Sequence, residues 1–273
     1  DTASSSASAP GVADLERDRD RPAGEETDVS DAPQVKGNRL DPWLDNYAAR
    51  AHGLRASETR SLFAVAARPE VVSLAGGMPN LKDLPLDELA EATARMIRKD
   101  SGRALQYGNG QGLPALREWI PQVMMLEGID ADPDDVVVTN GGKQAVFQAF
   151  AALVDPGDEV ILPTPYWTTY PEVIALAGGR AVEVFAGADQ DYKVTVDQLE
   201  AARTPRTKAL LVCSPSNPTG AVYTPAELTA IGQWALEHGI WVITDEIYEH
   251  LLYDGAESAH IVALVPELAD RAV

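Results

Sequence analysis

The sequence CSPSNPTG at residues 213–220, followed by TDEIY at residues 244–248, decides how this chain folds. Each motif comes directly after a short apolar run, ALLV at residues 209–212 and IWVI at residues 240–243. Runs of this length and composition are typical of parallel strands that are buried on both faces. The polar residues of both motifs therefore follow the carboxyl ends of two predicted strands.

A helix is predicted between these two strands. Residues 225–238 have helical periodicity, with Thr224 placed to cap the N-terminus and Gly239 placed to end the helix. Such a strand–helix–strand unit brings polar residues to the edge where open parallel sheets bind ligands. An asparagine, an aspartate and a tyrosine at one sheet edge suit an aromatic cofactor that has a ring nitrogen and a phenolic oxygen.

The preceding part of the chain also alternates strands and helices. Apolar runs at residues 136–139, 160–163 and 181–184 predict buried strands. Helical patterns span residues 86–99, 114–127, 170–177 and 196–202, and a further helix opens at residue 144. This alternation predicts an α/β fold with a mostly parallel central sheet and flanking helices.

The composition limits the class of protein. The chain has 273 residues, of which 45% are apolar, and this is enough for a sizeable core. Its net charge of −20 argues against nucleic acid or an anionic membrane surface as a partner. No apolar run reaches the ~18 residues of a membrane span. The single cysteine, Cys213, excludes a disulfide framework within the chain, so we expect a soluble protein of the reducing cytoplasm.

The motifs resemble those of the class I and II aminotransferases, which are fold-type I enzymes that use pyridoxal 5'-phosphate (PLP). SPSNPTG at residues 214–220 and TDEIY at residues 244–248 are two of the most specific motifs of that family. The resemblance implies the PLP-dependent transferase fold type I and PLP as the cofactor. It also implies ping-pong transamination between an L-amino acid and a 2-oxo acid.

The resemblance further implies how the chain is divided. Residues 39–80 would form an N-terminal arm and small-domain segment, and residues 81–273 would form a PLP-binding large domain that is incomplete at its C-terminal side. Residues 1–38 are rich in Ser, Ala, Pro and acids and almost lack large apolar residues. That composition predicts a disordered acidic extension.

Gly141, Gly142 and Lys143 lie between a predicted strand and a helix start. Glycines let the backbone approach a ligand, and free N–H groups together with the helix dipole favour a phosphate. The resemblance assigns this segment to the PLP phosphate, held mainly by the backbone N–H groups of Gly142 and Lys143. For the Lys143 side chain two interpretations stay open: a partner for the distal carboxylate of a dicarboxylic substrate, or a solvated lysine at the pocket mouth.

Two aromatic residues match family positions. Trp167 matches the residue that stacks on the pyridine ring and borders the substrate; the alternative is a core tryptophan at a strand end. Tyr107 matches a tyrosine that the partner subunit brings to the phosphate; the alternative is a loop aromatic packing on a neighbour. The match of Tyr107 implies a homodimer with a shared active site.

The remaining matches concern the ring and the substrate. Asn217 would hydrogen-bond the phenolic oxygen of the cofactor and help to position the substrate carboxylate. Asp245 would form a charged hydrogen bond with the pyridinium nitrogen, and Tyr248 would donate to the phenolic oxygen. Gly77 matches a glycine whose backbone N–H contacts the substrate carboxylate.

The family also needs a lysine that forms a Schiff base with PLP, some tens of residues after Asp245. The last lysine of this chain is Lys208, before Asn217. We therefore expect no catalytic residue within the chain and a Schiff-base lysine beyond Val273. No grouping of His, Cys and Asp has metal-ligand spacing, so no metal site is expected.

The substrate and the activity keep alternatives. GGKQ at residues 141–144 and PYW at residues 165–167 point to an aspartate-type enzyme, whereas SLAGGMPN at residues 73–80 looks more like the loop of broad-specificity 2-aminoadipate, aromatic or branched-chain aminotransferases. An inactive truncated homologue is another alternative. A PLP-binding metabolite sensor would carry a DNA-binding helix-turn-helix, for which residues 1–38 are too short and too acidic.

Overall fold

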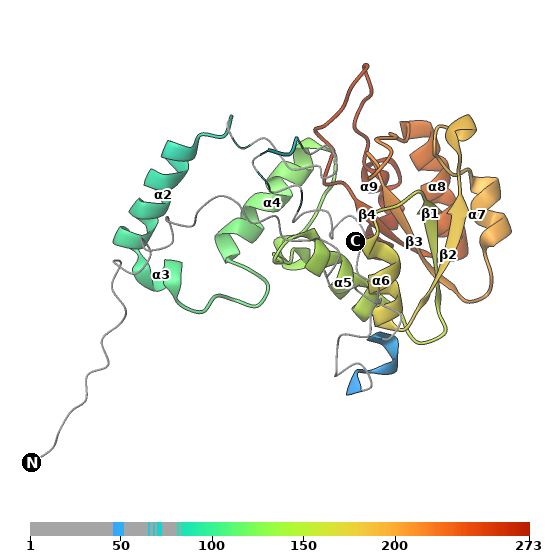
Figure 1. Ribbon diagram of the computed structural model, residues 1–273, viewed down its shortest axis with the longest axis horizontal. Coiled ribbons are helices and arrows are strands. Elements are labelled where there is room, and N and C mark those ends of the chain that lie inside the picture. Colours follow the sequence, from blue (N-terminus) through green and yellow to red (C-terminus); the bar gives the residue numbers. More distant parts are fainter. Residues whose placement is uncertain (1–45, 52–64, 66–67, 69, 73–80, 82) are drawn as a thin grey trace, which may run out of the picture. The chain divides into compact units, whose positions relative to one another are not determined.

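The computed structural model describes residues 46–51, 65, 68, 70–72, 81 and 83–273. The chain divides into two units, residues 1–46 and 47–273, and all but one of the described residues belong to the second. The predicted extension and most of the predicted arm segment lie outside the described residues, so the domain boundaries stay predictions. The helices and strands of Figure 1 belong to the second unit.

The second unit alternates helices and strands as the sequence predicts. Its helices are η4 (Ala49–Ala51), α2 (Leu86–Lys99), α3 (Ser101–Leu105), α4 (Pro114–Leu126), η5 (Pro133–Asp135), α5 (Gly142–Leu153), α6 (Thr169–Ala177), η6 (Ala188–Gln190), α7 (Val196–Ala202), α8 (Pro225–His238), α9 (Ile261–Leu264) and η7 (Pro266–Arg271). Its strands are β1 (Glu159–Thr164), β2 (Arg180–Phe185), β3 (Thr207–Cys213) and β4 (Trp241–Asp245). In the described part of the chain, no helix combines the length and the hydropathy that a membrane span requires.

The four strands form one sheet in the order β2-β1-β3-β4, and every pairing is parallel. The register sets Cys213, the last residue of β3, beside Asp245, the last residue of β4. An isolated parallel bridge joins Val242 to Ala272, next to β4. The predicted parallel sheet is thus confirmed, and the carboxyl ends of β1, β3 and β4 meet at one edge.

Both faces of the sheet are buried. Successive side chains of a strand point to opposite faces, so neighbouring residues belong to different clusters. Ile161 and Leu210 belong to a core cluster with α7, α8 and α9, whereas Val160 and Leu211 belong to a second cluster with α5 and α6. Figure 1 shows these helices on the two sides of the sheet. Because helices cover both faces, the sequences of these strands are continuous apolar runs.

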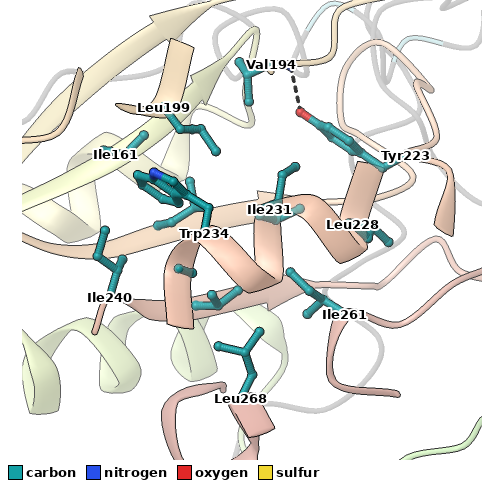
Figure 2. Packing of buried hydrophobic residues seen from close by; sticks show 14 of the residues in the cluster. Ile161, Val194, Leu199, Tyr223, Leu228, Ile231, Trp234, Ile240, Ile261 and Leu268 are labelled. Atoms are coloured by element: carbon teal, nitrogen blue, oxygen red, sulfur yellow. Dashed lines mark hydrogen bonds between the residues drawn. The ribbon is translucent and has the colours of Figure 1, made fainter. Parts of the chain in front are cut away.

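Helix α8 is the main cover of the first face. Its residues Ile231 and Trp234 are 2% and 5% exposed, and Figure 2 shows them packed near Ile161 and Leu199. The helix begins as predicted, with a capping box between Thr224 and Glu227. It ends at Gly239, whose φ of 65° is the left-handed conformation that favours glycine.

One predicted strand is wrong. Residues 136–139 are extended but belong to no strand, and Val137 is 51% exposed. Within the described residues, one backbone hydrogen bond joins this segment to a distant part of the chain, from the N–H of Val138 to the carbonyl oxygen of Gln111 at 2.8 Å. A strand needs a ladder of such bonds to a neighbouring strand, and none of the described strands pairs with this segment.

A buried acid stands at the start of β1. Glu159 has no exposed surface, and its carboxylate accepts hydrogen bonds from Arg180 (2.6 Å), Arg206 (2.6 and 2.9 Å) and Thr204 (2.7 Å). These donors, with Arg180 contributing most, lower the pKa of Glu159 from its ordinary value of 4.5 to about 2. The carboxylate is tolerated inside because each oxygen has donors.

We expect Glu159→Gln to lower the free energy of unfolding at pH 7 by about 2 kcal/mol, the typical worth of hydrogen bonds to a charged group. Because the pKa of Glu159 is lower in the folded state, its stabilising effect is complete above about pH 4.5 and is lost as the pH falls towards about 2. Urea unfolding at several pH values measures this, with Glu237→Gln at an exposed position of α8 as the control. A difference between wild type and Glu159→Gln that stays constant down to pH 2 would contradict the assignment.

Candidate functional site

A pocket of about 400 Å³ opens where the sheet edge meets the N-terminus of α5. Its volume lies in the range of small-molecule and cofactor sites. The residues that line it come from α5, from the loop after β1 and the start of α6, and from the ends of β3 and β4 with the loops that follow them. They are Gly142, Lys143, Ala145, Val146, Trp167, Tyr170, Cys213, Asn217, Thr244, Asp245, Glu246, Ile247 and Tyr248.

Six predicted site residues therefore line one pocket, although they are spread over more than a hundred positions of the chain. They are Gly142, Lys143, Trp167, Asn217, Asp245 and Tyr248. Gly141 precedes the pocket wall, Tyr107 is not among the lining residues and is 99% exposed, and Gly77 lies outside the described residues. Parallel strands gather Trp167, Asn217, Asp245 and Tyr248 at one edge, because these residues end or follow β1, β3 and β4. Gly142 and Lys143 reach the same pocket from the N-terminus of α5.

The N-terminus of α5 presents free donors to the pocket. Gly141 is the residue before the helix, and its φ of 83° is a conformation that other residues rarely adopt. Within the described part of the chain, neither the N–H of Gly142 nor that of Lys143 has a hydrogen-bond partner. A Cβ atom added at Gly142 would meet nothing within 4 Å. Two unpaired N–H groups at the positive end of a helix favour an anion.

Asp245 ends β4 with its carboxylate held on both oxygens. The Tyr170 hydroxyl donates to Oδ2 at 2.7 Å, and the N–H of Ile247 donates to Oδ1 at 3.2 Å. The side chain is partly buried and borders the pocket. It can therefore accept a further hydrogen bond from a cationic donor in the pocket.

Asn217 and Tyr248 meet across the pocket. The Nδ2 of Asn217 donates to the Tyr248 hydroxyl at 3.4 Å. Because the hydroxyl oxygen accepts this bond, its own hydrogen is left to donate to a ligand. An acceptor oxygen between these two side chains would find donors from both.

One side of the pocket is lined by aromatic residues. Trp167 contacts Tyr170 edge to face, with ring centroids 5.4 Å apart and an angle of 87° between the planes. The Lys143 Nζ lies 5.2 Å from the centroid of the Trp167 ring, within the range of a cation–π contact. In the described residues Lys143 has no carboxylate partner, although the chain carries many acids.

Tyr170 and Cys213 are polar residues of the pocket that the sequence alone did not assign to the site. Tyr170 is 1% exposed. Tyr170 follows Trp167 by three positions at the start of a helix, so helical spacing puts it on the same side of the turn. Cys213 reads in the sequence as a small residue at the end of an apolar strand, yet its register partner is Asp245.

The fold also gathers acids that are spread along the sequence. The His260 Nδ1 lies 2.7 Å from Oε2 of Glu246, and its Nε2 lies 3.9 Å from carboxylate oxygens of Glu127 and Glu249. Ligand atoms of Glu246, Glu249 and His260 lie within 4.8 Å of one another, as do those of Glu127, Glu249 and His250. The expectation of no metal site rested on spacing in the sequence and stays a prediction.

Comparison with known proteins identifies the family. The profile of aminotransferase class I and II matches residues 69–272. The chain belongs to this family. The aspartate aminotransferase of Streptomyces avermitilis is 56% identical over 169 residues, which cover 62% of this chain and 41% of that protein.

Solved structures agree in fold with this member of the aminotransferase class I and II family. The crystal structure of the aspartate aminotransferase from Rhizobium meliloti matches with a TM-score of 0.76 and 35% identity, covering 83% of this chain and 57% of that one. The Thermus thermophilus aspartate aminotransferase with maleate gives a TM-score of 0.75 and 38% identity, with 83% and 58% covered. The fold is thus the PLP-dependent transferase fold type I, and the chain spans about half the length of these relatives.

Proposed function

We propose that this chain forms the cofactor-binding domain of a PLP-dependent aminotransferase of the aspartate type. One observation carries the proposal: a single pocket combines two free N–H groups at a helix N-terminus, an indole face and a carboxylate at a strand end. These three features suit the phosphate, the ring face and the ring nitrogen of PLP, in that order. When bound, PLP supplies an electron sink for a substrate that loses its α-proton.

The residues of the pocket would divide the binding of PLP among them. The backbone N–H groups of Gly142 and Lys143 would bind the phosphate, and Gly141 supplies the turn that aims them. Trp167 would cover the ring face. Asp245 would hold a proton at the ring nitrogen through a charge-assisted hydrogen bond.

Two side chains would serve the phenolic oxygen. Asn217 and Tyr248 already contact each other at 3.4 Å, and each offers a hydrogen to an oxygen between them. Asn217 would also help to orient the carboxylate of the substrate. Gly77 is proposed for that carboxylate on the resemblance alone.

We further propose a cytoplasmic homodimer with a shared active site. Tyr107 supports it, because this side chain is 99% exposed and does not line the pocket of its own chain. It would then be available to the phosphate of a partner subunit.

We also propose the domain division that the resemblance implies. Residues 1–38 would form an acidic extension, residues 39–80 an arm and small-domain segment, and residues 81–273 would belong to the large domain.

Binding of PLP by this chain tests the proposal directly. We expect PLP to quench tryptophan fluorescence through Trp167, and Gly142→Pro to weaken the affinity by about tenfold or more. Proline removes the N–H of Gly142 but fits the first position of a helix, and ψ of 166° at Gly141 suits a residue before proline. The expected factor is that of one lost hydrogen bond to a charged group.

Gly142→Ala is the matched control, because it keeps the N–H and its Cβ enters open space. We expect this variant to bind PLP within about twofold of wild type. No saturable quenching by PLP would refute the cofactor proposal. Equal affinities of the proline and alanine variants would refute the phosphate site alone.

The aspartate type rests on Lys143 and on the relatives. Lys143 projects a cation towards Trp167 without a carboxylate partner in the described residues, so it can pair with the second carboxylate of an acidic substrate. A relative named aspartate aminotransferase, 56% identical over 169 residues, favours this over the 2-aminoadipate, aromatic or branched-chain alternative.

In a form of the protein that transaminates, Lys143→Met should lower kcat/KM for aspartate about 10-fold to 100-fold and leave that for a monocarboxylic amino acid within about threefold, because one ion pair to the distal carboxylate is lost. Steady-state kinetics with aspartate and leucine measure the two values. Lys99→Met, at the end of α2, is the control for loss of a positive charge. Equal losses for both substrates would remove Lys143 from the specificity site.

A further inference from the structure

Tyr170 lies behind the two residues that we assign to the cofactor ring. It is the second residue of α6, and only 1% of its surface is exposed. Its hydroxyl donates to Oδ2 of Asp245 at 2.7 Å, and its ring meets the Trp167 indole edge to face at 5.4 Å. One buried side chain therefore contacts both the carboxylate and the indole.

We propose that Tyr170 is a positioning residue that fixes the Asp245 carboxylate against the ring nitrogen of the cofactor and aligns it with Trp167. The inference rests on the proposed function, because it concerns the same pocket. Tyr170 would not touch the cofactor ring nitrogen itself. It would act through Asp245.

The geometry restricts the Asp245 carboxylate to one orientation. Tyr170 donates to Oδ2 and the N–H of Ile247 donates to Oδ1, so rotation of the carboxylate breaks at least one bond. A carboxylate offers about four lone-pair sites, so both oxygens keep capacity for a ligand. Burial raises the pKa of the Tyr170 hydroxyl well above its usual range, so the hydroxyl stays a donor.

The hydrogen bond from Tyr170 to Asp245 connects two parts of the sheet edge whose strands, β1 and β4, are not paired with each other. Trp167 and Tyr170 share the turn after β1, where the N–H of Tyr170 donates to the carbonyl oxygen of Trp167 at 3.0 Å. Asp245 ends β4, and β3 separates β1 from β4 in the sheet. The Tyr170 hydroxyl reaches across the end of β3, so the indole and the carboxylate keep a constant separation.

The test compares the binding of PLP with that of its 1-deaza analogue, in which carbon replaces the ring nitrogen. We expect Tyr170→Phe to weaken PLP about fivefold to tenfold, because it keeps the ring packing but frees the carboxylate. For the deaza analogue, which has no nitrogen for Asp245, we expect a change below about twofold. Tyr166→Phe is the matched control, because Tyr166 precedes α6 in the loop after β1 and its hydroxyl donates to Glu183 of β2 at 2.7 Å instead of to Asp245.

A double-mutant cycle gives a second measurement. In an Asp245→Asn background we expect Tyr170→Phe to change PLP affinity by less than about twofold. The double variant also serves if Tyr170→Phe alone does not fold, since it relieves the buried charge that has lost its donor.

Each outcome bears on one proposal. Equal losses for PLP and the deaza analogue, no loss for either, or a full effect of Tyr170→Phe in the Asp245→Asn background would overturn the positioning role. Failure of wild type to bind PLP at all would instead overturn the proposed function.

Discussion

Replacing Asp245 by alanine is expected to lower the rate of transamination about 10³-fold in a form of the protein that transaminates. The carboxylate is the acidic group of the pocket that ends a strand and is held on both oxygens. A preorganised charge of this kind, aimed at the place where charge develops, typically contributes two to three orders of magnitude. Without it the ring nitrogen has no fixed partner to keep it protonated.

Binding and chemistry should separate in this variant. The phosphate donors at Gly142 and Lys143 and the Trp167 face are untouched, so Asp245→Ala should still bind some PLP. Asp245→Asn is the control for shape, because it keeps the size of the side chain and removes the charge. We expect it to fold and to be nearly as slow; single-turnover rates with saturating PLP measure both. Activity of the alanine variant within about tenfold of the parent would remove Asp245 from the ring-nitrogen site.

The sequence predicted the parts of the fold that depend on local patterns. Helix α8 lies between Thr224 and Gly239, because a capping side chain and a left-handed glycine act within one turn of the two ends. Strands β3 and β4 were predicted because burial on both faces produces continuous apolar runs. With both strands parallel, Asn217 and Asp245 had to arrive at the same edge.

Features that depend on distant contacts were missed. Residues 136–139 have the composition of a buried strand, but a strand also needs a paired neighbour, which composition does not reveal. Glu159 reads as a surface acid, yet Arg180 and Arg206 arrive from more than 20 positions away and allow its burial. Tyr170 is one of eight tyrosines, and its role depends on a hydrogen bond to a residue 75 positions later.

The clearest all-or-none expectation concerns covalent attachment of PLP. We expect the 273-residue chain, treated with PLP and borohydride and then digested with trypsin, to yield no peptide with a stoichiometric pyridoxyl-lysine. The chain has six lysines: Lys36, Lys82, Lys99, Lys143, Lys193 and Lys208. Lys36 and Lys82 lie outside the described residues, so the structural argument concerns the other four.

Three of these four, Lys99, Lys193 and Lys208, do not line the pocket. Lys208 is the second residue of β3, five positions before Cys213, so the strand rise puts it about 16 Å from the pocket end. Lys193 is paired with Glu227 at 2.9 Å, and Lys99 ends α2.

Among the four described lysines, Lys143 alone lines the pocket, and it decides how the labelling is read. Its backbone belongs to the proposed phosphate site, and its ammonium lies over the Trp167 ring, so its amine starts from the phosphate end of the cofactor. We therefore expect at most substoichiometric labelling there, and Lys143→Met should abolish it. Quantitative peptide mass spectrometry measures both. A single lysine labelled to one equivalent would show that the cofactor lies in a different orientation, because a covalent bond fixes the aldehyde carbon within reach of that amine.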